Sequence, residues 1–300
     1  MTFNRPTLRF SLMLAALLLA LPWALSAQTA GASSDEDETN PNYIVITLDD
    51  GVAADGLLTA DVTAQLYAFD GSAGDIVTVT MTQSEDSSLD PYIVLLGPLG
   101  QLVAKDDDSG ELASSAQITE VELPANGSYF IIAASFKTIN AIVVPTGGTE
   151  TKISDTEFAY TVSASGFTAP PEEERQFFTS RLVTGVSDDG YSTLAEPVYY
   201  FTYVSAEDGE VVDINLTSEQ FDTVVMVFGP GGDRIAANDD GEGVGTNSSL
   251  IGVVLPEQAK YLMFATDVAF PNAGNPEATL KYKGGDFTII VTAGTSEIKK

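Results

Sequence analysis

Hydrophobic and polar residues alternate along several short segments of the chain, with the period of two that is typical of a β-strand with one buried face. Residues 77–81 and residues 212–216 show this alternation most clearly. Residues 92–96 and residues 224–228 are apolar throughout, as expected of a central strand that is covered on both faces. No sustained helical period occurs outside the N-terminal segment, so the pattern predicts an all-β protein.

Each fully apolar segment is followed by a tight turn, a short apolar run and an acidic cluster. The sequence GPLGQLVAKDDD occupies residues 97–108, and GPGGDRIAANDD occupies residues 229–240, displaced by 132 positions. The same displacement relates residues 118–134 to residues 250–266. A repeat of this length indicates a tandem duplication in which each copy is large enough to fold as a domain.

The repeated unit has the punctuation of a β-sandwich. Proline and glycine occupy the tight turns of both copies, and an Asn126-Gly127 turn precedes another apolar strand. We expect each copy to form an antiparallel β-sandwich of about seven or eight strands, jelly-roll-like rather than a closed barrel.

Composition marks the boundaries between the predicted units. Residues 28–42 are polar and acidic, which is typical of a disordered linker. Pro170 and Pro171, followed by three glutamates, interrupt the strand pattern. The predicted organisation is a signal peptide (1–27), a disordered acidic linker (28–42), a first β-sandwich (43–167), a linker (168–175), a second β-sandwich (176–294) and a tail (295–300).

The N-terminal segment, residues 1–27, has the features of an export signal. Arg5 and Arg9 precede an apolar run, residues 12–21, which is followed by small residues up to Ala27. The run is short for a membrane span and no second run follows, so we expect cleavage near Ala27 and release. The predicted location is extracellular or periplasmic.

Composition excludes many enzyme classes. The chain of 300 residues has no cysteine and no histidine, which removes disulfides, thiolate nucleophiles, serine-histidine triads and histidine-ligated metals. The formal net charge is −30 at pH 7. Such a chain is repelled by nucleic acids and anionic lipids, so cations or basic surfaces are its natural partners. The alternative is that the charge only maintains solubility.

Three segments in the first copy together resemble a known family. They are LDPYIVLLGPLGQLVAKDDDSG, ITEVELPANGSYFIIAA and FAYTVSASG, and YAFDGSAGDIVTVTM precedes them. In this order they resemble the bacterial pre-peptidase C-terminal domain, which is related to the collagen-binding domains of clostridial collagenases. The resemblance covers residues 43–166 and, less closely, residues 175–293. It implies a β-sandwich that is usually not catalytic, and that aids secretion or folding of a partner peptidase or attaches to an extracellular matrix or polymer.

The acidic turns are candidate calcium sites, because Ca²⁺ prefers hard oxygen ligands and tolerates irregular geometry. The alternative is that one aspartate in each turn accepts backbone N–H bonds while the others are solvated. The candidate ligands are Asp90, Asp106, Asp107 and Asp108 in the first copy, and Asp222, Asn238, Asp239 and Asp240 in the second.

The resemblance also indicates where calcium would not bind. The related collagen-binding domains hold calcium partly with a D-x-D pair just before a Y-x-F strand. Here the matching positions are Thr63 and Gln65 in the first copy, and Pro197 and Tyr199 in the second. A metal site would therefore use the acidic turns, or else one of the two pairs Asp49-Asp50 and Asp188-Asp189.

The sequence thus predicts a secreted, non-catalytic accessory protein that binds an extracellular protein, matrix or polysaccharide. A second hypothesis is a secretion or folding helper for a separately encoded secreted peptidase. A third is a carboxylate-dependent hydrolase, since 43 acidic residues can place two carboxylates at a glycosidase separation. The triplet Asp222-Thr-Val falls short of an aspartic protease loop. Candidate aromatic residues for a binding face are Tyr191, Phe136 and Phe270, with core packing as the alternative.

Overall fold

The computed structural model describes residues 45–85, 87–110, 115–136, 157–177, 179–241, 244–270 and 283–294. All of them belong to one compact unit, Asp37–Lys300. The predicted signal peptide, acidic linker and C-terminal tail lie outside the described residues. Within the described part of the chain, no helix has the length and apolar character needed to cross a membrane.

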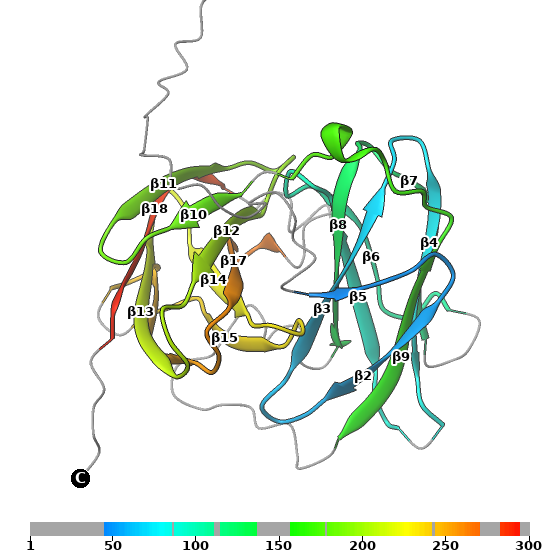
Figure 1. The fold of residues 1–300 in the computed structure, drawn as a ribbon, viewed down its shortest axis with the longest axis horizontal. Coiled ribbons are helices and arrows are strands. Elements are labelled where there is room, and N and C mark those ends of the chain that lie inside the picture. Colours follow the sequence, from blue (N-terminus) through cyan, green and yellow to red (C-terminus); the bar gives the residue numbers. More distant parts are fainter. Residues whose placement is uncertain are drawn as a thin grey trace, which may run out of the picture. The chain divides into compact units, whose positions relative to one another are not determined.

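Strands make up nearly all of the regular structure, which confirms the all-β prediction (Figure 1). A short 3₁₀ helix, Glu172–Glu174, separates two sets of strands. The N-terminal set is β1 (Ile46–Thr47), β2 (Ala53–Leu58), β3 (Ala64–Gly71), β4 (Ile76–Gln83), β5 (Pro91–Leu96), β6 (Leu102–Asp106), β7 (Ser115–Glu122), β8 (Gly127–Ser135) and β9 (Phe158–Ser165). The C-terminal set is β10 (Ser180–Leu182), β11 (Ser187–Ser192), β12 (Tyr199–Val204), β13 (Glu210–Thr217), β14 (Thr223–Phe228), β15 (Arg234–Asn238), β16 (Ser248–Leu255), β17 (Lys260–Asp267) and β18 (Gly285–Ala293).

The two sets form sheets with the same strand order. The N-terminal half contains a sheet β1-β3-β8-β5-β6 and a sheet β2-β9-β4-β7. The C-terminal half contains β10-β12-β17-β14-β15 and β11-β18-β13-β16, which is the same order nine strands later. The pairs are antiparallel except β1 with β3 and β10 with β12, which are parallel. These two parallel pairs differ from our prediction of purely antiparallel sheets. They arise because the intervening strand, β2 or β11, belongs to the four-stranded sheet of its half, so the strands before and after it run in the same direction.

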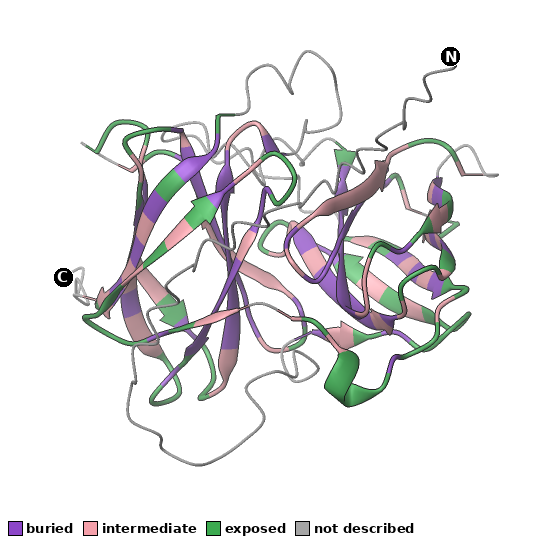
Figure 2. Ribbon diagram, turned by 90° about the horizontal axis from the view of Figure 1, so that it is seen from above, coloured by how far each residue is buried: buried purple, intermediate pink, exposed green. Residues whose placement is uncertain are grey.

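Each half has a hydrophobic core of its own. One cluster of buried side chains comes only from residues between Leu48 and Ala164, and another only from residues between Leu182 and Val291. The alternation predicted for residues 77–81 is confirmed, since Val77, Val79 and Met81 of β4 are buried and the threonines between them are partly exposed. Figure 2 shows the buried positions along the strands.

The central strands β5 and β14 are buried on both faces, as predicted from their continuous apolar sequences. In β5, Ile93 and Leu95 belong to the core of the N-terminal half. The alternate side chains enter a third apolar cluster to which both halves contribute. From these two strands, that cluster contains Tyr92, Val94, Leu96, Val224, Met226 and Phe228.

The two Gly-Pro turns connect the halves. Each turn closes with an N–H···O bond of 3.0 Å, from Gly100 to Gly97 and from Gly232 to Gly229. The carbonyl of Gly100 accepts the N–H of Val198 at 3.2 Å, and the carbonyl of Gly232 accepts the N–H of Leu66 at 2.8 Å. A methyl group on either terminal glycine would overlap the carbonyl of its partner strand. The glycines are therefore required by close backbone approach as well as by their positive φ angles.

The same tyrosine anchor occurs in both halves. The hydroxyl of Tyr129 donates to the carbonyl of Ala125 at 2.7 Å, and the hydroxyl of Tyr261 donates to the carbonyl of Glu257 at 2.8 Å. Both tyrosine rings are fully buried. Each bond fixes the turn that precedes a core strand. It also gives the hydroxyl of a buried tyrosine a hydrogen-bond partner.

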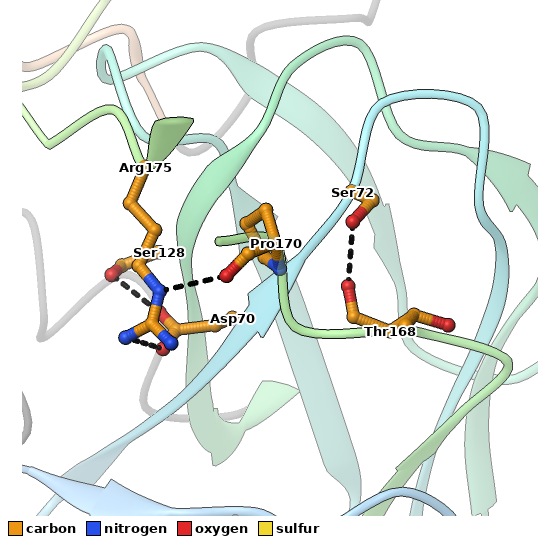
Figure 3. Close-up of polar contacts among 6 residues, drawn as sticks. All are labelled: Asp70, Ser72, Ser128, Thr168, Pro170 and Arg175. Carbon is orange, nitrogen blue, oxygen red and sulfur yellow. Dashed lines mark hydrogen bonds and ion pairs between the residues drawn. The ribbon is translucent and has the colours of Figure 1, made fainter. Parts of the chain in front are cut away.

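The segment between the halves is fastened to the N-terminal half (Figure 3). Arg175 forms an ion pair with Asp70 at 2.8 Å and donates to the carbonyl of Pro170. Ser128 donates to the same aspartate at 2.7 Å, and Ser72 donates to the carbonyl of Thr168 at 2.7 Å. The residues predicted as a linker are thus held by side-chain bonds to Asp70 of β3 and to Ser72 just after it.

Candidate functional site

The first acidic turn brings its three aspartates together. Carboxylate oxygens of Asp106, Asp107 and Asp108 all lie within 4.8 Å of one another, the only such group of three acidic side chains among the described residues. Asp106 also accepts the backbone N–H groups of Ser109 at 3.0 Å and Gln117 at 2.7 Å. One aspartate therefore stabilises the turn, and the other two extend the cluster of oxygen ligands.

The like charges in this turn repel one another. Burial and the like charges of Asp108, Asp106 and Asp90 raise the pKa of Asp107 above its ordinary value. Lys105 lies nearby, and burial lowers the pKa of its ammonium group. Asp90 contributes to this field but does not belong to the group of converging oxygens. A bound cation would relieve the repulsion, and hard oxygen donors suit Ca²⁺.

The second acidic turn is built similarly but has one carboxylate fewer. Asn238 accepts the N–H of Ser249 at 3.0 Å, as the first aspartate of the other turn does with its facing strand. Asp239 is buried and accepts the N–H of Asp240 at 2.8 Å. Replacement of an aspartate by Asn238 leaves two acids in the turn, and they form no group of three with another described acid.

Asp222 is the most perturbed carboxyl group near the second turn. Burial, followed by the charges of Asp240, Asp239 and Asp267, raises the pKa of Asp222 to about 6, while Lys283 opposes the shift. Its Oδ1 atom is buried and has no hydrogen-bond partner. The group is therefore protonated at mildly acidic pH, a property shared by general acids in enzymes.

The two aspartate pairs proposed as alternative ligands have structural partners. The second member of the Asp49-Asp50 pair accepts the N–H of Gly166 at 2.7 Å. The second member of the Asp188-Asp189 pair accepts the hydroxyl of Thr288 at 2.6 Å. Neither pair joins a third acidic side chain among the residues that the structure describes. Asp50 therefore connects the turn before β2 with the end of β9, and Asp189 connects β11 with β18.

The three candidate aromatic residues have different environments. Phe270 is 3% exposed and packs in the apolar cluster shared by the halves. Phe136 is exposed, and its ring lies 6.2 Å from that of Tyr92. Tyr191 is 59% exposed and borders a cavity. Only Tyr191 therefore combines exposure with a place in a concave site.

This cavity, which we call the tyrosine hollow, has a volume of about 210 Å³. Its apolar floor is formed by Val198 and Tyr200, both buried, and the hydroxyl of Tyr200 donates to the carbonyl of Gly97 at 2.9 Å. Its rim combines exposed and half-buried side chains. The lining residues are Leu99, Tyr191, Glu196, Val198, Tyr199 and Tyr200.

Sequence reasoning identified Tyr191 but missed the rest of the hollow. Leu99 lies in the turn between β5 and β6, whereas the other lining residues lie between positions 191 and 200. Only the folded chain brings these segments together. The one signal in the sequence is the aromatic pair Tyr199-Tyr200, which a strand pattern assigns equally well to the core.

Comparisons with known proteins leave the family open. No family model and no curated protein matches the chain. One similar solved structure is the periplasmic g-type lysozyme inhibitor PliG from Aeromonas hydrophila, with 14% identity over 41% of this chain and 95% of that chain, and a TM-score of 0.28. Others are the CUB1-EGF-CUB2 domains of human MASP-1/3 (10% identity, 79% and 99%, TM-score 0.18) and the tandem CBM22 domains of Paenibacillus barcinonensis Xyn10C (10% identity, 81% and 92%, TM-score 0.21). Likenesses this weak carry no argument about function.

Proposed function

We propose that the chain is a secreted, non-catalytic binding protein that attaches to a basic surface of an extracellular protein or polymer. Its two halves are tandem, jelly-roll-like sandwiches of the pre-peptidase C-terminal type. The observation that carries the proposal is the repeated strand order, which places an acidic turn after β6 in one half and after β15 in the other. Two similar modules on one chain increase avidity for a repetitive ligand.

Charge supports a basic partner. The formal net charge of −30 creates a negative potential that attracts cationic groups and accelerates their association. Absence of histidine and cysteine from the sequence supports a binding role over catalysis, because the usual bases and nucleophiles are missing.

A retention assay separates this function from the other two hypotheses. A chain that comprises residues 28–300 is passed over immobilised poly-L-lysine, collagen fibres, cellulose and poly-L-glutamate. Salt-sensitive retention on the basic or fibrous supports favours the proposal. Co-purification with a secreted peptidase, without retention on any support, favours the helper hypothesis and contradicts ours.

The hydrolase hypothesis is favoured by one observation, the raised pKa of Asp222. A hydrolase that uses this group as its acid would lose turnover of a glycoside or peptide substrate in the Asp222→Asn variant. Measured turnover with this dependence would contradict a purely binding role. We expect no turnover with either the native chain or the variant.

We further propose that Ca²⁺ stabilises the first acidic turn, with Asp106, Asp107 and Asp108 as ligands. We expect CaCl₂ to raise the melting temperature relative to chelator, by an amount equivalent to about 2.7 kcal/mol at a concentration one hundred times the dissociation constant. Asp107→Asn should abolish this increase, and the exposed control Asp61→Asn should retain it. Equal melting temperatures in calcium and chelator, with no heat of binding in calorimetry, would exclude the site.

A further inference from the structure

Ring packing and a backbone hydrogen bond fix several of the side chains that line the tyrosine hollow. The ring of Tyr200 in its floor packs at 5.2 Å from Phe130 and 5.0 Å from Phe264. On the rim, the ring of Tyr199 lies 4.9 Å from that of Phe201. Glu196 belongs to a turn in which its N–H donates to the hydroxyl of Thr193 at 3.0 Å. The site is therefore preorganised, which lowers the entropic cost of binding.

The residues of the hollow match the chemistry of a basic side chain. An apolar floor packs against the methylene groups of lysine or arginine. An exposed tyrosine ring, that of Tyr191, attracts the cationic end through its π face. Glu196, a charged residue of the lining, can form a charge-assisted hydrogen bond with the same group.

The size of the hollow limits the ligand to one side chain. Its volume of about 210 Å³ is below the roughly 300–1,000 Å³ of sites for drug-sized ligands. Among the residues that the structure describes, none of those lining the hollow is basic, so they offer an anionic ligand no countercharge. A sugar could stack on the tyrosines, but its hydroxyls would meet few polar groups besides Glu196 and the phenols.

The other half provides an internal comparison. The turn of the N-terminal half, residues 97–100, accepts a backbone hydrogen bond from Val198, which precedes β12. In the same way, the turn of the C-terminal half, residues 229–232, accepts one from Leu66 of β3. There, a basic side chain of the chain itself is already present, since Arg234 donates to the hydroxyl of Thr63. Beside it, Gln65 donates to Asp233 at 2.7 Å. One of the two similar junctions thus contains an arginine of the chain itself, and the other has a hollow.

We propose that the tyrosine hollow binds a single lysine or arginine side chain of a partner protein, with Tyr191 contacting the cation and Glu196 pairing with it. The inference rests on the proposed function and deepens it, because it names the group that the partner presents. It is independent of calcium in the acidic turns.

The test is an NMR titration of the ¹⁵N-labelled chain that comprises residues 28–300. The probes are the capped tripeptides Gly-Lys-Gly, Gly-Arg-Gly and Gly-Glu-Gly, and cellohexaose. We expect the two basic peptides to shift the amide signals of residues 191–200 and the acidic peptide to leave them unchanged. Glu196→Gln and Tyr191→Ala should each weaken binding at least about tenfold, whereas Glu207→Gln, an exposed carboxylate beyond the opposite end of β12, should bind as the native chain does. Unchanged melting temperatures show that the variants are folded.

Several outcomes would overturn the inference. Equal effects of Glu196→Gln and Glu207→Gln would indicate attraction to overall charge only. Binding of cellohexaose that depends on Tyr191 but not on Glu196 would indicate a carbohydrate site. If the tripeptides do not bind while poly-L-lysine still does, the inference fails and the proposed function stands. If the native chain binds neither, both fail.

Discussion

At the scale of single residues, Glu120 in β7 has a positive φ of 49°, which is unfavourable for a side chain other than glycine. Gly252 in β16 has a φ of 69° at the corresponding bulge of the other half. We expect Glu120→Gly to stabilise the protein by about 0.5–1 kcal/mol, and Gly252→Ala to destabilise it by about 1 kcal/mol. Denaturant unfolding measures both changes. Opposite signs would show that side-chain contacts, and not backbone strain, determine stability there.

Asp222 gives a second prediction at this scale. Its raised pKa means that the native state binds the proton more tightly than the unfolded chain does, between its ordinary value of 3.8 and about 6. The contribution of this group to the free energy of unfolding is therefore present at low pH and decreases as pH rises through this range. In chelator-containing buffer, Asp222→Asn should gain stability relative to the native chain from about pH 4 to pH 7. A pH-independent difference between the two proteins would contradict the shifted pKa.

At the scale of elements, a glycine in β11 accommodates a large ring of the paired strand β18. Gly190 pairs with Phe287, and a methyl group on the glycine would overlap the buried ring. Gly190→Ala should therefore cost roughly 1–3 kcal/mol through overpacking. Ser187→Ala, at an exposed position of the same strand, is the control, and its effect should stay within the small range that is usual for surface substitutions. Denaturant unfolding that gives both variants the same stability as the native chain would contradict this packing.

The pairing of Gly190 with Phe287 also illustrates why some strands could be predicted from the sequence and others could not. Strands β4, β5, β13 and β14 carry their signal in their own apolar pattern. The sequence of β11, SDDGYS, has no such pattern because its glycine is covered by Phe287 from a distant strand. Gly56 in β2 pairs with Tyr160 in the same way. The repeat therefore extends further upstream than the apolar pattern alone indicates.

The two candidate sites also differ in how far they could be predicted from the sequence. The converging oxygens of Asp106, Asp107 and Asp108 could be predicted, because the three residues are consecutive and lie at the end of a strand. The tyrosine hollow could not, since Leu99 reaches it from a turn that is far away in the sequence. Close approach of that turn depends on Gly100 and its bond with Val198, which are properties of the folded chain.

At the scale of the whole molecule, two sets of sheets with one strand order share an apolar cluster and carry a large negative charge. One face of each five-stranded sheet is buried in that cluster and the other in the core of its own half, so binding to outside partners falls to the turns and loops. We assign the recognition of a basic partner to these acidic and aromatic surfaces.

The most direct measurement is equilibrium binding of the chain that comprises residues 28–300 to immobilised poly-L-lysine and poly-L-glutamate, by surface plasmon resonance at low and at physiological salt. We expect saturable binding to poly-L-lysine alone, which weakens with salt and is at least about tenfold weaker in Glu196→Gln. Absence of binding to poly-L-lysine at low salt, or equal binding to both polymers, would contradict it.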